Sequence, residues 1–160
     1  MANRIHIIGG PGSGKSMLAR RLAAEQGLPH IELDSIFWND AAGGYDVRRD
    51  PEERDLLLKQ VVDGDSWIIE GVYYAWCGPS YERAERIILL DTPTWIRHWR
   101  LGLRFVKRKL GLEVKGPSRK KDSFKGYWSI TKWNARWDRD NLSGAKEALK
   151  PFGSKLELIR

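Results

Sequence analysis

The segment Arg4-Ile5-His6-Ile7-Ile8-Gly9-Gly10-Pro11-Gly12-Ser13-Gly14-Lys15-Ser16 decides the fold, because it joins a short apolar run to a glycine-rich turn and the start of a helical pattern. Gly9, Gly14, Lys15 and Ser16 satisfy G-x-x-x-x-G-K-[ST], the pattern of a phosphate-binding loop (P-loop). That motif requires a strand before it and a helix after it, and the flanking patterns supply both. The segment therefore predicts a strand, a P-loop and a helix in succession.

The loop predicts a site for a nucleoside triphosphate. Glycines adopt backbone conformations that are closed to residues with a Cβ, so successive N–H groups can turn inward around a phosphate. The helix that begins near Lys15 aims its free amides and its positive dipole end at the same anion. We expect Lys15 to reach the β- and γ-phosphates and Ser16 to bind Mg²⁺. The residues expected to contact the nucleotide are Gly10, Pro11, Gly12, Ser13, Gly14, Lys15, Ser16 and Met17.

Length and composition favour one domain that spans residues 1–160, because 160 residues with 41% apolar content suffice for one sizeable core. No run of about 18 apolar residues occurs, and the first residues lead directly into the predicted strand. We therefore expect no membrane span, no secretion signal and a cytoplasmic location. The single cysteine, Cys77, cannot form an internal disulfide, which fits a reducing compartment.

Two carboxylates are expected at the carboxyl ends of predicted strands, where ligands bind in open α/β sheets. Asp34 follows the predicted strand His30–Leu33 and is expected either to orient a phosphoryl acceptor or to cap the next helix. Glu70 ends the strand Ser66–Gly71 and is the second candidate for binding Mg²⁺ or orienting the acceptor. Nearby aromatic residues are expected either to wall an acceptor pocket or to fill the core: Phe37, Trp38, Tyr73, Tyr74 and Trp76.

The sequence Asp50-Pro51-Glu52-Glu53 predicts the start of a helix, with Asp50 as its N-cap and Glu53 closing a capping box. Residues 39–49 before it are expected to form a loop over the acceptor side. The apolar face of the helix is expected to consist of Leu56, Leu57 and Val61.

Further strands are predicted at Arg86–Asp91 and Lys155–Ile159, the latter near the edge of the sheet. Ser143 is expected to cap a short helix that ends before Pro151.

Residues 95–110 predict a helix with one apolar and one cationic face. The apolar face comprises Trp95, Trp99, Leu103, Val106 and Leu110, and the cationic face comprises Arg97, Arg100, Arg104 and Lys107. Because this helix begins just past a strand end, Arg100 and Arg104 are expected to point at phosphates held by the P-loop. The alternative is a solvated helix face.

The net charge of +7 is concentrated in one segment. Residues 97–125 contain eleven Lys or Arg and two acids, a local charge of +9, whereas the rest of the chain carries −2. This favours a local polyanion site over general coating of nucleic acid. The segment is expected to form a basic lid, or alternatively a surface loop, followed by a helix from Phe124 in which Arg136 or Arg139 supplies another phosphate contact.

Strands that alternate with helices after a P-loop predict an α/β fold of the P-loop NTPase class. We expect a five-stranded parallel sheet with helices on both faces and a helical basic lid. The order of the motifs resembles adenylate kinases and, more closely, the adenylate-kinase-like family labelled DNA topology modulation (FlaR-type) proteins. The matching residues are Gly9–Ser16, Leu33-Asp34, Trp67–Gly71, Leu90–Pro93, Arg100, Arg104 and the Trp-rich segment after the basic loop.

The resemblance implies roles for several basic residues. It matches Arg100 and Arg104 to lid-helix arginines that contact transferring phosphates in nucleoside monophosphate kinases, and Arg136 or Arg139 to those after the lid. Glu70 stands where the family usually has Asp before Gly, so its carboxylate extends about one methylene further. No arginine of the chain matches the one that holds the acceptor's phosphate in adenylate kinases.

The leading hypothesis is an ATP- and Mg²⁺-dependent kinase that transfers the γ-phosphoryl group to a nucleotide or another small acceptor. Lys15, Arg100, Arg104 and Asp34 are the expected catalytic residues, and Arg136 joins the nucleotide-binding set. The alternatives are a nucleotide-dependent DNA-binding or regulatory protein and a nucleoside triphosphatase without an acceptor.

Overall fold

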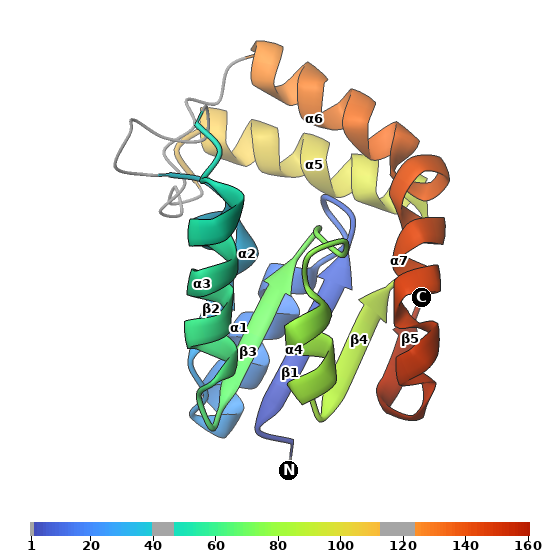
Figure 1. Cartoon of the computed structure of the whole chain (residues 1–160). Coiled ribbons are helices and arrows are strands. Elements are labelled where there is room, and N and C mark those ends of the chain that lie inside the picture. The colour runs from blue at the N-terminus through green and yellow to red at the C-terminus, as the bar shows by residue number, and fades with distance from the viewer. Residues whose placement is uncertain (1, 40–46, 113–123) are drawn as a thin grey trace.

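The computed structural model, which describes residues 2–39, 47–112 and 124–160, is built on a five-stranded parallel sheet with strand order β2-β3-β1-β4-β5 (Figure 1). The strands are β1 (Arg4–Gly9), β2 (His30–Glu32), β3 (Trp67–Gly71), β4 (Arg86–Leu90) and β5 (Leu156–Ile159). The strand that leads into the P-loop is thus central, and β5 lies at an edge as predicted. The near-continuous burial of β1, β3 and β4 is typical of strands covered on both faces.

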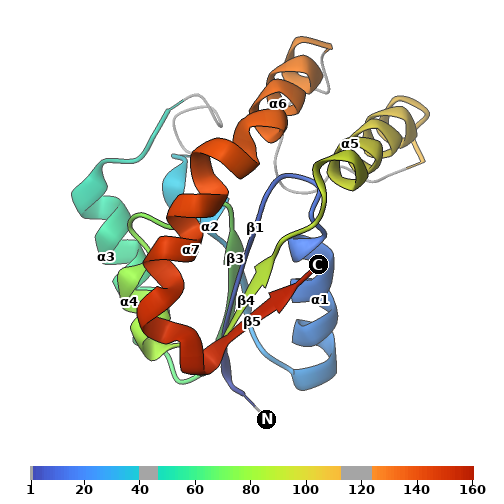
Figure 2. The ribbon, with the colours of Figure 1, turned by 90° about the vertical axis from the view of Figure 1, so that its right-hand side faces the viewer.

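Helices cover both faces of this sheet. They are α1 (Lys15–Gln26), α2 (Leu33–Phe37), α3 (Pro51–Val62), α4 (Gly78–Arg83), α5 (Thr94–Lys109), α6 (Phe124–Trp137) and α7 (Ser143–Leu149), with a π-helical turn η2 (Asp138–Leu142) and a 3₁₀ turn η3 (Lys150–Lys155). Figure 2 shows α1 on one side of the sheet and α3, α4 and α7 on the other. The fold predicted from the sequence, a parallel α/β sheet between two helical layers, is confirmed.

Each face of the sheet has its own apolar core. Under α1, the cluster includes Ile5, Ile7, Ala19 and Leu22, which alternate along β1 and repeat at helical spacing along α1. The larger opposite cluster joins the sheet to α2, α3, α4 and the C-terminal helices. Its buried members are Ile8, Leu33, Ile36, Leu58, Val62, Trp67, Ile69, Cys77, Tyr81, Ala84, Ile87, Leu89, Trp137, Leu142 and Leu149.

A buried polar chain links β1 to α4. Ser80 Oγ donates to the Cys77 carbonyl at 2.7 Å, and His6 Nδ1 lies 2.8 Å from the same Oγ. Because the hydroxyl has only one proton, His6 Nδ1 must be the donor, so the neutral ring carries its proton on Nδ1 and not on Nε2. Burial lowers the pKa of His6 to about 3, although the charge of Glu70 acts in the opposite direction.

Two local predictions, for Asp34 and for Ser143, need correction. The second strand ends at Glu32 and Leu33 already begins α2, so Asp34 lies in the first helical turn and not at a strand end. Ser143 is the first residue of α7 and not its cap, because the backbone is helical from α6 through η2.

Helix α3 begins as predicted, but two details of the prediction are wrong. Asp50 Oδ1 accepts from the amide of Glu52 at 2.9 Å, whereas Glu53 pairs with Arg49 instead of closing a capping box. The helix buries Leu58 and Val62, and Leu57 and Val61 pack partly buried against the same core as predicted, whereas Leu56 is exposed. The part of the predicted loop at residues 40–46 lies outside the described residues.

Helices α5 and α6 pack against each other and form an arm beyond the carboxyl ends of the strands (Figures 1 and 2). The apolar stripe of α5 does not face the core, since Trp95 is 73% and Trp99 68% exposed. The buried residues of this helix are instead Arg97 and Leu101. The arm is helical, as expected for the lid, but residues 113–123 of the predicted lid lie outside the described residues.

Among the helices of the described residues, none combines the length and apolar content needed to cross a membrane.

Candidate functional site

The P-loop connects β1 to α1 and adopts the conformation that its glycines allow. Gly12 and Gly14 have φ angles of 76° and 101°, in the region that favours glycine. The amide of Ser13 donates to the carbonyl of Gly10 at 3.1 Å, and Gly14 is the residue before the first helical turn. The loop therefore opens directly onto the N-terminus of α1, where free amides and the helix dipole favour an anion.

Helix α5 contacts this loop with two arginines. Arg100 Nη1 donates to the carbonyls of Ser13 at 2.8 Å and Gly12 at 3.4 Å. A Cβ added to Gly10 would lie 2.4 Å from Arg97 Nη1, so the buried Arg97 guanidinium is packed against the loop. Thr92 Oγ1 also donates to the Ser13 carbonyl, at 3.2 Å. These bonds occupy the carbonyls of Gly12 and Ser13, so the groups available to an anion are the loop amides other than that of Ser13.

Arg97 is held from the other side by Thr94 and Asp138, at the base of the arm. Its Nη2 donates to Thr94 Oγ1 at 3.0 Å and to Asp138 Oδ1 at 2.7 Å. Thr94 Oγ1 also donates to Asp138 Oδ2. Arg97, which the sequence assigned to an exposed cationic face, is thus an internal link between the P-loop, α5 and η2.

Glu70 is buried beside the start of α1. Ser16 Oγ donates to Glu70 Oε1 at 2.7 Å, and Lys15 Nζ lies 3.9 Å from Oε2. His30 Nε2 is 3.8 Å from Oε1. Burial on its own raises the pKa of Glu70, but His30, Lys15 and Ser16 together hold it below its usual range. Glu70 is therefore a carboxylate at neutral pH, within reach of the hydroxyl expected to bind a cation.

Asp34 lies near this group from the first turn of α2. Tyr73 Oη donates to Asp34 Oδ1 at 2.9 Å. Burial raises the pKa of Asp34, and the negative charges of Glu70 and Glu32 act in the same direction, against the Tyr73 hydrogen bond and the charge of Lys15. A carboxylate with a raised proton affinity beside a P-loop lysine is suited to accept a proton from a substrate hydroxyl.

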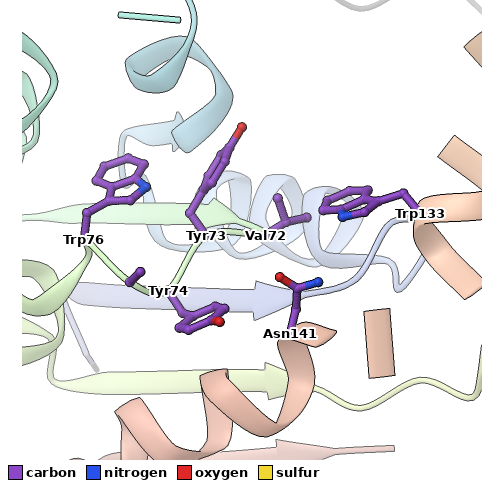
Figure 3. Close-up of a pocket in the computed structure, with 7 residues that line it drawn as sticks. Val72, Tyr73, Tyr74, Trp76, Trp133 and Asn141 are labelled. Atoms are coloured by element: carbon purple, nitrogen blue, oxygen red, sulfur yellow. The ribbon is translucent and has the colours of Figure 1, made fainter. Parts of the chain in front are cut away.

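An aromatic pocket of about 280 Å³ is lined on one side by Tyr73, which donates to Asp34, and on the other by Trp133 and Asn141 at the base of the arm. Its lining residues are Val72, Tyr73, Tyr74, Ala75, Trp76, Trp133 and Asn141. Figure 3 shows Tyr73 and Trp76 on one side of the segment after β3 and Tyr74 on the other, with Trp133 and Asn141 reaching toward this segment from the C-terminal helices. Phe37 stacks on Tyr73 with ring centroids 4.5 Å apart. The aromatic residues singled out in the sequence thus form both a packed layer and a pocket wall.

The other residues predicted to contact phosphate are exposed on their helices. Arg104 is exposed on α5, and Arg136 is exposed in the last turn of α6. The pKa of Asp140 is held below its usual value first by the hydrogen bond from Arg139 and also by the charge of Arg136. Met17 lies in the first turn of α1 and is 72% exposed.

Four residues at this end of the sheet were not predicted from the sequence as site residues: His30, Glu32, Thr92 and Asn141. The sequence indicated that His30 and Glu32 share a face, since they are alternate residues of a strand, but their position beside Glu70 depends on strand register. Asn141 had no signal, because its position depends on how η2 packs.

Comparison with known proteins shows relatives along most of the chain. The uncharacterized protein YqaC of Bacillus subtilis is 28% identical over 150 residues, which cover 93% of this chain and 80% of that protein. A cytidylate kinase of Aeropyrum pernix is 29% identical over 138 residues, covering 78% and 79% of the two chains. No family model matches the sequence.

A crystal structure of shikimate kinase from Bacteroides thetaiotaomicron aligns with 99% of this chain and 85% of its own, with a TM-score of 0.52 and 18% identity. This likeness supports the P-loop kinase-like fold and does not bear on substrate. The resemblance to DNA topology modulation proteins stays a prediction, because the Bacillus subtilis relative is itself uncharacterized.

Proposed function

We propose that this protein is a single-domain, ATP- and Mg²⁺-dependent kinase that transfers the γ-phosphoryl group to the hydroxyl of a small acceptor. The observation that carries the proposal is the convergence of Lys15, Ser16, Glu70 and Asp34 where the P-loop opens onto α1. One relative is a cytidylate kinase, which supports phosphoryl transfer as the reaction class.

In this proposal the loop amides and Lys15 hold the triphosphate, while Arg100 lies beside the same loop. Phosphoryl transfer needs little covalent chemistry from the protein, so positioning and charge neutralisation supply most of the catalysis. Arg100 and Arg104 stabilise the charge on the transferring group, a contribution of roughly 10³ to 10⁵ in rate where such an arginine acts. Arg136 contacts the nucleotide from the last turn of α6, at the base of the arm.

The residues present fit a magnesium ion. Mg²⁺ prefers oxygen ligands and keeps several waters, and the Ser16 hydroxyl and Glu70 carboxylate supply two oxygens 2.7 Å apart. The longer Glu70 side chain reaches the hydroxyl directly. When bound, the ion would neutralise charge on the β- and γ-phosphates.

The acceptor occupies the aromatic pocket with its hydroxyl toward Asp34. Asp34 orients that hydroxyl and takes its proton, and Tyr73 fixes the carboxylate through its hydrogen bond. Guanidinium groups stand over two rings of this aromatic layer, Arg48 over Phe37 at 5.8 Å and Arg54 over Trp76 at 4.7 Å. The aromatic lining of the pocket favours a planar acceptor.

A phosphate-transfer screen with ATP and Mg²⁺ tests the proposal, using nucleoside monophosphates, nucleosides and small hydroxylated metabolites as acceptors. Lys15→Ala is expected to abolish transfer while the protein stays folded. Lys150→Ala, which removes a surface lysine paired with Glu147, is the matched control and is expected to be fully active. Undiminished activity in Lys15→Ala would refute the proposal, as would a purified protein that binds no nucleotide.

Two further measurements on the same purified protein would identify the alternative functions. DNA affinity that falls steeply with salt, with a slope near −0.9 per phosphate contact, would favour the nucleotide-dependent DNA-binding protein. Phosphate release that no acceptor changes would favour a nucleoside triphosphatase.

A further inference from the structure

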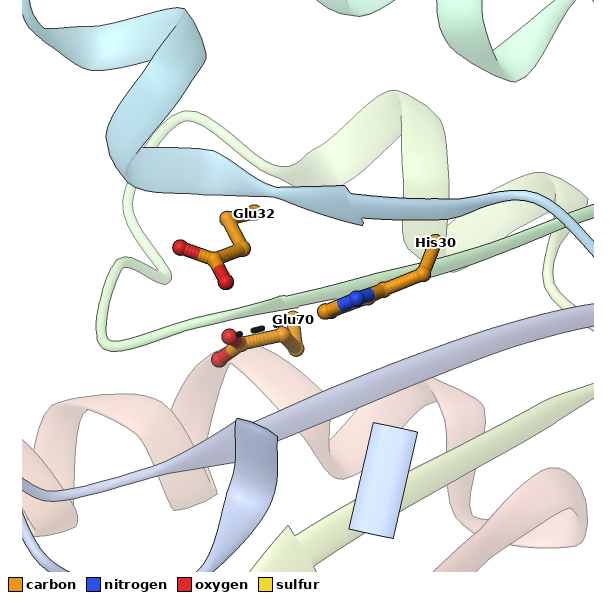
Figure 4. A group of neighbouring side chains, drawn as sticks. All are labelled: His30, Glu32 and Glu70. Carbon is orange, nitrogen blue, oxygen red and sulfur yellow. Dashed lines mark ion pairs between the residues drawn. The ribbon is translucent and has the colours of Figure 1, made fainter. Parts of the chain in front are cut away.

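Three potential metal ligands lie together on the face of the sheet that α1 covers. His30 and Glu32 are alternate residues of β2 and therefore share a face, and Glu32 is paired in register with Glu70 of β3. Figure 4 shows the His30 ring and the two carboxylates turned toward one another, with the His30–Glu70 pair dashed. One ligand atom from each residue lies within 4.8 Å of the other two.

The histidine nitrogen of this cluster indicates which metals the site would bind. His30 Nε2 is buried and, in the part of the chain that the structure describes, has no hydrogen-bond partner, since Glu70 Oε1 is 3.8 Å away. A separation of this size is close to that of two ligands bound to one ion at about 2.0–2.2 Å each. Imidazole suits first-row transition metals, whereas Mg²⁺ takes oxygen ligands.

We infer that His30, Glu32 and Glu70 form a site for a transition-metal dication that binds in the absence of nucleotide. This site shares Glu70 with the proposed magnesium ligands but differs from them in its nitrogen ligand and in needing no phosphate. Mn²⁺ and Co²⁺ are the probes, because both accept one imidazole with carboxylates and both have spectroscopic signatures.

The charges around the cluster allow a dication to enter. The two carboxylates are balanced by Lys15, 3.9 Å from Glu70, and by Arg20, 3.3 Å from Glu32. The Arg20 side chain is 63% exposed, so it can leave Glu32 for solvent at small cost. Arg20 therefore competes with the metal, and its removal should strengthen binding.

The experiment titrates the full-length protein with Mn²⁺, without nucleotide, and measures free Mn²⁺ by electron paramagnetic resonance. We expect His30→Asn and Glu32→Gln each to weaken binding by about tenfold or more, since loss of groups around a metal ligand already costs 10- to 100-fold. His98→Asn is the matched control, because it removes another histidine with a buried Nε2, on α5, and should bind like the wild type.

Two further measurements separate a metal ligand from a structural histidine. Arg20→Ala is expected to bind Mn²⁺ more tightly than the wild type. Partial unfolding would weaken Mn²⁺ binding, so tighter binding cannot result from damage to the fold. Bound Co²⁺ is expected to show a visible spectrum that differs from that of the aqueous ion and is lost in His30→Asn.

Several results would overturn the inference. They are no Mn²⁺ binding at about 1 mM without nucleotide, His30→Asn binding as the wild type does, or Mg²⁺ displacing Mn²⁺ at equal concentration. Binding of Mn²⁺ by a protein that transfers no phosphoryl group would support the metal site and refute the proposed kinase.

Discussion

Replacing Gly10 with alanine tests whether the P-loop is packed directly against the base of the arm. The added Cβ would lie 2.4 Å from Arg97 Nη1 and 2.9 Å from Trp137 Cδ1. Both neighbours are buried, and the Arg97 guanidinium is also bonded to Thr94 and Asp138. Neither side chain can give way without losing packing or hydrogen bonds, so the loop or the arm must shift.

The size of the effect follows from this overpacking. Extra methylene groups in a well-packed core typically cost about 1–3 kcal/mol. For a chain of this length each kcal/mol lowers the melting temperature by roughly 2–4 °C, so a fall of about 2–12 °C is expected. A displaced loop also presents its amides less well to phosphates, so ATP affinity should fall as well.

The assay is thermal unfolding followed by tryptophan fluorescence, with ATP titration by calorimetry. Gly78→Ala is the control, because a Cβ at the start of α4 meets nothing within 4 Å. The control should unfold at the wild-type temperature or slightly above it, since alanine is the better helix former. If Gly10→Ala unfolds at the wild-type temperature with wild-type ATP affinity, the packing argument is wrong.

Three other predictions concern pH and charge. The folded-state pKa of His6, about 3, lies below the ordinary 6.5, so only the unfolded state takes up a proton between these values. Between pH ~6.5 and ~3, the free energy of unfolding should therefore fall by about 1.4 kcal/mol for each pH unit. Urea titrations at several pH values measure this slope. The contribution of His6 to it should be missing in His6→Gln. Glu157→Gln breaks an exposed pair with Arg86 at 2.7 Å and should cost less than about 1 kcal/mol in the same assay; a larger loss would contradict this. Tyr73→Phe removes the hydrogen bond that lowers the pKa of Asp34, so the acidic limb of the pH–rate profile for phosphoryl transfer should move to higher pH. An unchanged profile would contradict the role of Asp34.

The parallel sheet and the P-loop could be predicted because their signals are local. A run such as Trp67–Gly71 is apolar throughout, and the loop motif fixes the order of strand and helix around it. The edge position of β5 was also predicted, since Leu156–Ile159 alternates in polarity as a half-covered strand does.

The orientation of the arm could not be predicted, because periodicity defines two faces of a helix but not which one is covered. Trp95 and Trp99 belong to the apolar face of α5, yet both are exposed and Arg97 is buried, since it reaches both the P-loop and Asp138. The pairing of His30 with Glu70 depends on strand register, which sequence spacing alone does not fix.

The bonds of Arg97 also have a mechanical consequence. They join the first turn of α5 to the residue that follows α6, so both helices of the arm are tied at the same point beside Gly10. Because the arm is held at its base, a small displacement of the loop there would produce a larger displacement at the distal end, near the tilted rings of Phe105 and Tyr127. A change in the loop on ligand binding would therefore be passed to the arm through Arg97 and Arg100.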